Sequence, residues 1–309
     1  MYPDYRQFMH LLAIARCGSF SGAATLLRMS QPALSNSISQ LESRLKTRVL
    51  DRGRSGARLT DAGQALARHA EILETQMERA LEEVRFRRMS QLGPLNVGVT
   101  PVAAASLVPR ALALLKKEMP MLAARVIETV FHEGMPALLK GSLDVMVGPI
   151  GVYAPFDGIE EQQLTFDPFS VIVREDHPLA SRRSLSLRQL AEVEWVLPSD
   201  QSAFHRQLEA LFVVAGLTWP QRAIVTNSMA AMKSIAMHSD CVAIMPKQLV
   251  TIEQKAGLLR AIRLTEAGAS RALGISWAKE RRLSEPAAAF VSALQECVRS
   301  SRRQEPRIG

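Results

Sequence analysis

The stretch RMSQPALSNSISQLESRL, from Arg28 to Leu45, carries a row of small polar side chains suited to hydrogen bonding. Its large apolar residues stand at offsets of 0, 4, 7 and 11 from Leu34, which predicts a helix with one buried face. A solvated helix usually carries Lys and Glu on its other face, but this one carries uncharged groups. These are Pro32, Asn36, Ser39 and Ser43, flanked by Gln31, Ser35 and Gln40.

Basic residues surround this predicted helix. Residues 1–60 hold nine Lys and Arg against three acids, a net charge of +6 within a chain total of +8. The segment VLDRGRSGARLT predicts two short extended pieces around a turn that brings Arg52, Arg54 and Arg58 together. A polyanion is the partner such a segment favours, although charge alone would fit an ordinary solvated surface as well.

Three short helices must position these groups. A first amphipathic helix ends at Gly18, a second restarts at Ser19 or Ser21, and Ser30 caps the third, whose first turn tolerates Pro32. With the basic turn after them, they predict an all-α winged helix-turn-helix domain over residues 1–60. In such a domain the first turn of the second motif helix enters the major groove, where base edges pair with Gln, Asn and Ser.

The residues expected to contact DNA follow from this geometry. Base reading and helix positioning are assigned to Ser30, Gln31, Pro32, Ser35 and Asn36, and phosphate contact to Arg52 and Arg54. The alternative is a plain polar helix with serine as filler.

A long helix is predicted over residues 61–92, because no Pro or Gly interrupts the chain between Gly63 and Gly93. Its apolar positions alternate steps of four and three, as in the seam of a coiled coil. They are Leu66, Ala70, Leu73, Met77, Ala80 and Val84. A dimerisation helix is the favoured interpretation and packing against its own domain is the alternative. The segment SQLGP, ending at Pro94, is expected to break the helix and form a hinge.

Residues 93–309 alternate short apolar strands with helices, which predicts α/β structure with parallel strands covered on both faces. The last predicted strand and helix are left over from the second set of elements and are expected to complete the first set. The chain would then form two lobes, with lobe I at 93–167 and 271–309 and lobe II at 168–270. It would cross between the lobes near 166–168 and near Ser270.

Other classes of protein are disfavoured by the composition. The richest apolar stretch is interrupted by Arg110, which argues against a membrane span, and no signal peptide is apparent, so we expect a cytoplasmic protein. Cys17, Cys241 and Cys297 are too scattered for a disulfide framework or a zinc cluster. No phosphate-binding glycine loop occurs, and the nearest match to a nucleophile elbow, GSFSG, has Phe20 where serine is needed. We expect no metal, no cofactor and no enzyme activity.

The chain resembles the LysR-type transcriptional regulators over its whole length. The most specific part of the resemblance is GSFSGAATLLRMSQPALSNSISQLESRL, followed by Arg52, by LT at 59–60 and by AG at 62–63. Two departures are visible, because Leu50 stands where the family usually has Phe and Lys46 where it usually has Gly. These departures concern the packing of the wing and not the positions that read bases.

The resemblance implies a linker-helix dimer, often a tetramer, and a two-lobed effector domain similar to periplasmic binding proteins. Its implied partners are double-stranded DNA, a small-molecule effector, a second copy of the chain as homodimer or homotetramer, and RNA polymerase. By family position the effector pocket takes Thr100, Pro101, Gly148, Pro149, Ser202, Ala203, Asn227, Ser228 and Met229. Val102 is expected to add to its apolar wall. For each of these residues, turn or capping duty is the alternative.

The sequence therefore predicts a DNA-binding transcriptional regulator that responds to a small organic effector. Thr100 ends a predicted apolar strand, where a hydroxyl can meet an anionic group. Its apolar neighbours favour an aromatic or branched acid over a sugar. The alternative from another class is a ligand-independent oligomeric DNA binder whose α/β domain serves only assembly.

Overall fold

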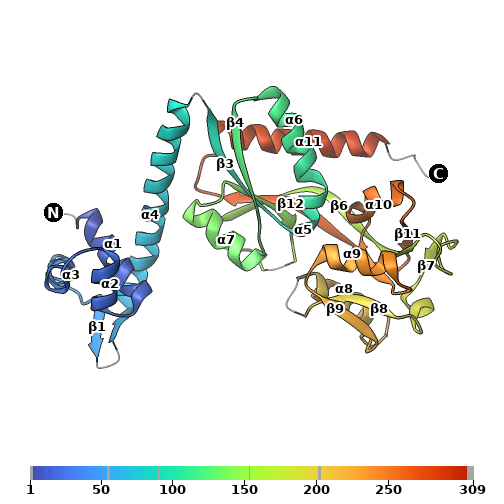
Figure 1. Ribbon diagram of the computed structural model, residues 1–309, viewed down its shortest axis with the longest axis horizontal. Coiled ribbons are helices and arrows are strands. Elements are labelled where there is room, and N and C mark those ends of the chain that lie inside the picture. Colours follow the sequence, from blue (N-terminus) through green and yellow to red (C-terminus); the bar gives the residue numbers. More distant parts are fainter. Residues whose placement is uncertain (1–2, 54–55, 90, 153, 201–202, 305–309) are drawn as a thin grey trace. The chain divides into compact units, whose positions relative to one another are not determined.

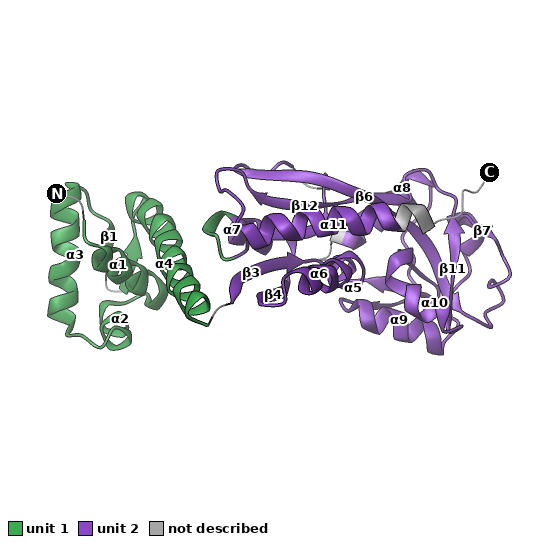
Figure 2. Cartoon of the chain, turned by 90° about the horizontal axis from the view of Figure 1, so that it is seen from above, with its two compact units in different colours: residues 1–90, 139–142 green, residues 91–138, 143–309 purple. Residues whose placement is uncertain are grey.

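The computed structural model describes residues 3–53, 56–89, 91–152, 154–200 and 203–304 of the 309-residue chain. The chain divides into two compact units, which Figure 2 shows in green and purple. Unit 1 comprises residues 1–90 and 139–142, and unit 2 comprises residues 91–138 and 143–309. Each unit is described by itself.

Unit 1 begins with three short helices around one small core. They are α1 (Tyr5–Cys17), α2 (Phe20–Leu26) and α3 (Gln31–Leu45). Asp4, Ser19 and Ser30 cap their N-termini with side-chain oxygens that accept backbone N–H groups. The core of the domain consists mainly of Leu11, Ile14, Ala23, Leu34, Ile38 and Leu41, all fully buried. The helices are therefore held by both local capping and shared apolar packing.

A two-stranded antiparallel wing follows, formed by β1 (Leu50–Gly53) and β2 (Gly56–Leu59). Leu50 is 3% exposed and packs in the domain core, so leucine fills the position where an aromatic residue was expected. Lys46 ends α3 with φ of 51°, in the left-handed region that favours glycine. The first departure thus leaves the wing packed, and the second places a lysine where glycine would be less strained.

The long helix α4 (Asp61–Arg88) follows the wing and is seen as one continuous helix in Figure 1. Thr60 caps it by accepting the N–H of Gly63 at 3.0 Å. At its other end the chain enters a strand at Leu92, so the expected break is there but is shorter than the sequence suggested. Pro94 lies inside that strand, where the register with its neighbour shifts between Leu92 and Leu95.

The first lobe of unit 2 is built on a sheet whose first three strands run parallel in the order β4-β3-β5. Its elements are β3 (Leu92–Val99), α5 (Pro101–Ala105), α6 (Leu107–Glu118), β4 (Leu122–Glu128), α7 (Phe131–Lys140), β5 (Val145–Pro149) and, from the end of the chain, β12 (Ser270–Ala278) and α11 (Glu285–Gln304). Helices α6 and α11 pack together over this sheet, as Figure 1 shows.

The sheet is mixed and not wholly parallel as the sequence led us to expect. Strand β12 pairs antiparallel with β5 and with β6 (Ile159–Arg174). Because β6 is 16 residues long, it continues from the first lobe into the second, where it pairs with β10 and β11. The sequence pattern shows that these strands are buried, but not the direction in which a returning strand pairs.

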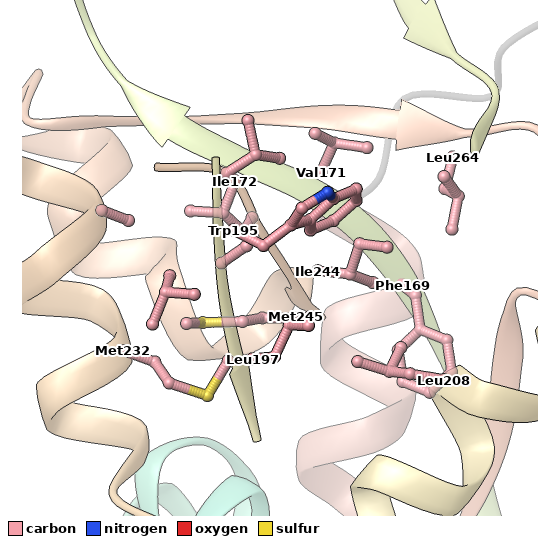
Figure 3. Close-up of a cluster of buried hydrophobic side chains, with 14 of the residues drawn as sticks. Phe169, Val171, Ile172, Trp195, Leu197, Leu208, Met232, Ile244, Met245 and Leu264 are labelled. Atoms are coloured by element: carbon pink, nitrogen blue, oxygen red, sulfur yellow. The ribbon is translucent and has the colours of Figure 1, made fainter. Parts of the chain in front are cut away.

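The second lobe surrounds its own apolar cluster. Its remaining elements are β7 (Ser184–Leu185), η1 (Leu187–Leu190), β8 (Trp195–Pro198), α8 (Ala203–Val214), β9 (Ala223–Thr226), α9 (Met229–His238), β10 (Ala243–Pro246), η2 (Lys247–Val250), α10 (Thr251–Lys255) and β11 (Leu259–Leu264). Figure 3 shows Trp195, Ile172 and Met232 within this cluster, contributed by a strand, a strand and a helix. Each lobe therefore has a core of its own.

Candidate DNA-binding surface and effector site

Helix α3 presents the polar face that its sequence predicted. Leu34, Ile38 and Leu41 are fully buried, while the groups on the opposite side are exposed. The exposed set at the start of the helix consists of Gln31, Pro32, Ala33 and Asn36, with Ser35 half-buried beside them. The Ser30 hydroxyl accepts the N–H of Ala33 at 3.3 Å, so Ser30 serves first as the cap of this helix.

Hydrogen bonds fix α3 against the wing and against α1. One carboxylate oxygen of Glu42 accepts the N–H groups of Val49 and Leu50 at 2.9 and 3.3 Å. The Ser37 hydroxyl lies 2.7 Å from Nδ1 of His10 on α1. These bonds hold the exposed face of α3 at a set angle to the basic wing, which is what a surface that docks into a groove requires.

The wing is tied to the helical core through its second strand. The N–H of Ala57 donates to the carbonyl oxygen of Gly18 at 2.9 Å, and a Cβ on Gly56 would lie 2.4 Å from that oxygen. Arg58 is exposed on this strand. The backbone of Arg52 lies in β1 opposite Ala57, but its side chain, like the whole of Arg54, lies outside the described residues.

The apolar seam of α4 divides into a covered part and an uncovered part. Ala70 is fully buried and Leu66 is half-buried against the helical core. Farther along, Leu73, Met77 and Val84 are 43%, 47% and 58% exposed. The first turns of the helix therefore pack on their own domain, whereas the later turns leave an apolar stripe uncovered.

Thr100 follows β3 at the edge where the parallel strands end. Its N–H donates to the carbonyl oxygen of Val147 at 3.1 Å, whereas its hydroxyl oxygen is buried without a hydrogen-bond partner and makes no cap to α5. Gly148 is required beside it, because a Cβ on Gly148 would lie 2.8 Å from Cγ2 of Thr100. Pro101 and Pro149 are half-buried at the same edge.

The other residues expected in the pocket lie in several environments. The side chain of Val102 packs into the apolar cluster of the second lobe and is 5% exposed. Met229 is half-buried against that cluster, and the Ser228 hydroxyl accepts the N–H of Ala231 at 3.2 Å. Asn227 is exposed. Ser202 and the side chain of Ala203 lie outside the described residues, although the backbone of Ala203 begins α8.

Sequence reasoning missed an ion pair that the fold brings to this edge of the sheet. Asp167 on β6 is the register partner of Arg271 on β12, and their side chains are 0% and 5% exposed. Nη2 of Arg271 lies 3.6 Å from Oδ2 of Asp167. Both residues lie where the chain was predicted to cross between the lobes. An acidic residue at one crossing and a basic residue at the other could have indicated this ion pair.

Burial acts strongly on this pair. Loss of hydration raises the pKa of Asp167 to about 6, and the positive charge of Arg271 offsets only part of that effect. Burial also lowers the pKa of Arg271. The guanidinium carbon of Arg271 lies 5.7 Å from the ring centre of Phe169 and 5.6 Å from that of Phe204 on α8.

The described part of the chain contains no helix that is both long and apolar enough to cross a membrane. No cluster of three or more His, Cys, Asp or Glu side chains in that part of the chain could hold a metal ion. Cys17 is exposed, Cys241 and Cys297 are buried, and none of the three forms a disulfide bond within the described residues.

Comparisons with known proteins match both parts of the chain. Residues 5–64 match the model of the bacterial regulatory helix-turn-helix protein, lysR family, and residues 90–299 match the LysR substrate binding domain. An SDS degradation transcriptional activation protein from a Pseudomonas species is 31% identical over 266 residues, covering 84% of this chain and 85% of that protein. The HTH-type transcriptional regulator YvbU from Bacillus subtilis is 31% identical over 186 residues, covering 60% of this chain and 62% of that protein.

Solved structures show the same fold. Full-length CbnR in complex with its target DNA matches with a TM-score of 0.67 at 21% identity, covering 95% of this chain and 99% of CbnR. The winged helix-turn-helix, the long helix and the two-lobed α/β domain therefore occur together in that protein as well. The chain belongs to the LysR family of bacterial transcriptional regulators.

Proposed function

We propose that this LysR-family regulator recognises a specific operator through α3 and responds to a small organic anion bound beside Thr100. The observation that carries the proposal is the exposed face of α3, which is uncharged within a strongly basic domain. Nonspecific binding needs only positive charge, whereas base reading needs neutral donors and acceptors of short reach. The polar face therefore favours sequence-specific recognition.

Gln31, Pro32, Ser35 and Asn36 are the proposed base-reading residues, with Ser30 positioning the first turn. Arg52 and Arg54 are proposed to contact phosphate groups from the wing. The CbnR structure with target DNA supports this use of the helix-turn-helix, since the two chains share a fold. The site of action would be the cytoplasm, where bacterial DNA lies.

Assembly is proposed to use the uncovered stripe of α4, through Leu73, Met77 and Val84. A homodimer formed there would bring two recognition helices to two half-sites. The edge strand β4 offers a further apolar surface, since Val126 and Ile127 are 46% and 40% exposed, which suits a tetramer. RNA polymerase is the proposed partner of the DNA-bound protein.

The effector is proposed to bind at the strand ends, where Thr100, Pro101, Gly148 and Pro149 lie together. The buried hydroxyl of Thr100 has no hydrogen-bond partner, so a ligand that hydrogen-bonds to it would supply the missing bond. Asn227, Ser228 and Met229 would contribute from the second lobe, with Ser202 and Ala203 at the start of α8. Val102 would act through the packing of α5 on the second lobe.

A thermal-unfolding screen with aromatic, branched and hydroxylated acids tests the effector proposal. A ligand that binds only the folded state raises the melting temperature with its concentration. All three tryptophans, Trp195, Trp219 and Trp277, lie in unit 2, so their fluorescence reports on the effector domain. A hit should also shift operator binding in an anisotropy titration. A complete lack of hits, with operator binding intact, would favour the ligand-independent DNA binder.

A further inference from the structure

Asp167 and Arg271 occupy the two strands that connect the lobes. Leu164 on β6 and Leu273 on β12 pack in the first-lobe cluster, whereas Phe169 on β6 packs in the second-lobe cluster. The ion pair therefore lies at the boundary between two separate cores.

The pair is buried but poorly satisfied. At 3.6 Å, Nη2 and Oδ2 are beyond hydrogen-bond distance. Both carboxylate oxygens of Asp167, and Nε and Nη2 of Arg271, are buried without a hydrogen-bond partner. Buried charges are ordinarily paired and fully hydrogen-bonded, so each of these four atoms is an exception.

The unsatisfied atoms of Arg271 have a specific geometry. Nε and Nη2 lie on one edge of the planar guanidinium, and their N–H groups point in parallel, which matches the two oxygens of a carboxylate. The rings of Phe169 and Phe204 lie beside the same guanidinium, with their centres 5.6 Å apart. An aromatic acid would place its acid group on this edge and its ring against apolar walls.

We propose that Arg271 is the residue that anchors the acid group of the effector, and that Asp167 is an internal counter-ion which the ligand replaces. This inference rests on the proposed function, because it names the residue that binds the charged group of the proposed effector. Asp167 holds the anion position in the free protein without completing the hydrogen bonds. A ligand carboxylate that reaches Nε and Nη2 completes them.

Thr100 lies directly after β3 and Arg271 lies on β12, which are different strands of the sheet. Thr100 follows Val99, whose partner on β5 is Val147, and Gly148 on β5 faces Gly274, three residues from Arg271. Two strand spacings and three residues of rise correspond to about 14 Å between the backbones of Thr100 and Arg271. The guanidinium of Arg271 reaches Asp167 and Phe169 on β6, which lies on the far side of β12 from β5 and β3. The Arg271 guanidinium and the Thr100 hydroxyl would therefore contact different parts of the ligand.

Three variants test the assignment, with sodium benzoate as the probe and benzamide as its uncharged analogue. Asp167→Asn removes the competing carboxylate and preserves the shape of the side chain. Asp167→Asn combined with Arg271→Gln also removes the cation without leaving a buried charge. Asp144→Asn is the matched control, because Oδ1 of the buried Asp144 likewise lies 3.6 Å from an arginine, Arg281.

Isothermal titration of the full chain should show that Asp167→Asn binds benzoate at least roughly tenfold more tightly than wild type, about 1.4 kcal/mol. Benzamide should not bind, the double variant should lose benzoate binding, and Asp144→Asn should match wild type. Tryptophan fluorescence confirms that the double variant is folded.

Three results would each overturn the assignment. Wild type and Asp167→Asn could bind benzoate with equal affinity, Asp167→Asn could fail to bind benzoate, or the folded double variant could bind it fully. Failure of the proposed function is a separate result. It would appear as a wild-type protein whose operator binding responds to no acid in the wider screen.

Discussion

Replacing Asp167 by Asn should stabilise the effector domain at neutral pH, although it removes one partner of an ion pair. The pKa of Asp167 is raised from 3.8 to about 6 in the folded protein, chiefly by burial. A raised carboxyl pKa means that the folded state binds the proton more tightly than the unfolded state. Ionisation of Asp167 therefore destabilises the fold, because attraction to the Arg271 charge does not fully offset the loss of hydration.

The direction of this pKa shift determines the pH range over which the stability of the folded state is lost. The destabilisation is absent below pH 3.8, grows as the pH rises to about 6, and is complete above that value. At about 1.36 kcal/mol for each pH unit of that interval, the upper limit is on the order of 3 kcal/mol. Asn resembles the protonated carboxyl in shape and charge, so Asp167→Asn should lack this pH-dependent loss.

Thermal unfolding followed by tryptophan fluorescence at several pH values from 4.5 to 8 measures the effect. At about 2–4 °C for each kcal/mol in a domain of this size, Asp167→Asn should melt up to about 6–12 °C above wild type at pH 7.5. The difference between the two proteins should shrink as the pH falls, to about a third of its full value at pH 4.5. A lower melting temperature for Asp167→Asn than for wild type at pH 7.5 would show instead that the ion pair is a net stabiliser of the fold.

Further predictions concern DNA, assembly and redox chemistry. Gln31→Ala should lose discrimination between operator and scrambled DNA, whereas Arg52→Ala should weaken binding to both DNAs and flatten its salt dependence. Gel-shift titrations at two salt concentrations distinguish these effects. Equal losses of affinity on both DNAs for Gln31→Ala would exclude base reading by Gln31. Leu73→Asp should give monomers in light scattering that no longer bind two half-sites, and an unchanged oligomer would move the contact elsewhere. Replacing Cys241 and Cys297 with Ser should leave DNA binding under peroxide as in wild type, because both thiols are buried, and a changed response would reveal a redox switch.

Local patterns in the sequence were sufficient to predict the three short helices and the wing of unit 1. The spacing of Leu34, Ile38 and Leu41 correctly predicts the buried face of α3, and Ser30 caps the helix as its type suggests. Periodicity could not show how far the α4 seam is covered, because that depends on α1, whose Arg16 pairs with Glu74 of α4 at 2.6 Å. Leu45 was expected on the buried face but is 37% exposed at the helix end.

The effector domain was less predictable because its contacts join distant segments. Asp167 and Arg271 are neighbours only through the antiparallel register of β6 and β12, which no local pattern encodes. Val102 was expected to line the pocket, and its burial in the second-lobe cluster likewise follows from tertiary packing.

The role of Thr100 can be tested by measuring operator binding of wild type and Thr100→Val by anisotropy across a titration of the identified effector. Valine keeps the shape of threonine and removes a hydroxyl that has no partner in the free protein, so operator affinity without effector should not change. The effector concentration that shifts DNA binding should rise roughly tenfold or more, as loss of about 1.4 kcal/mol requires. Thr218→Val, at an exposed position, should respond as wild type does. Identical effector responses of wild type and Thr100→Val would contradict the account and remove Thr100 from the effector site.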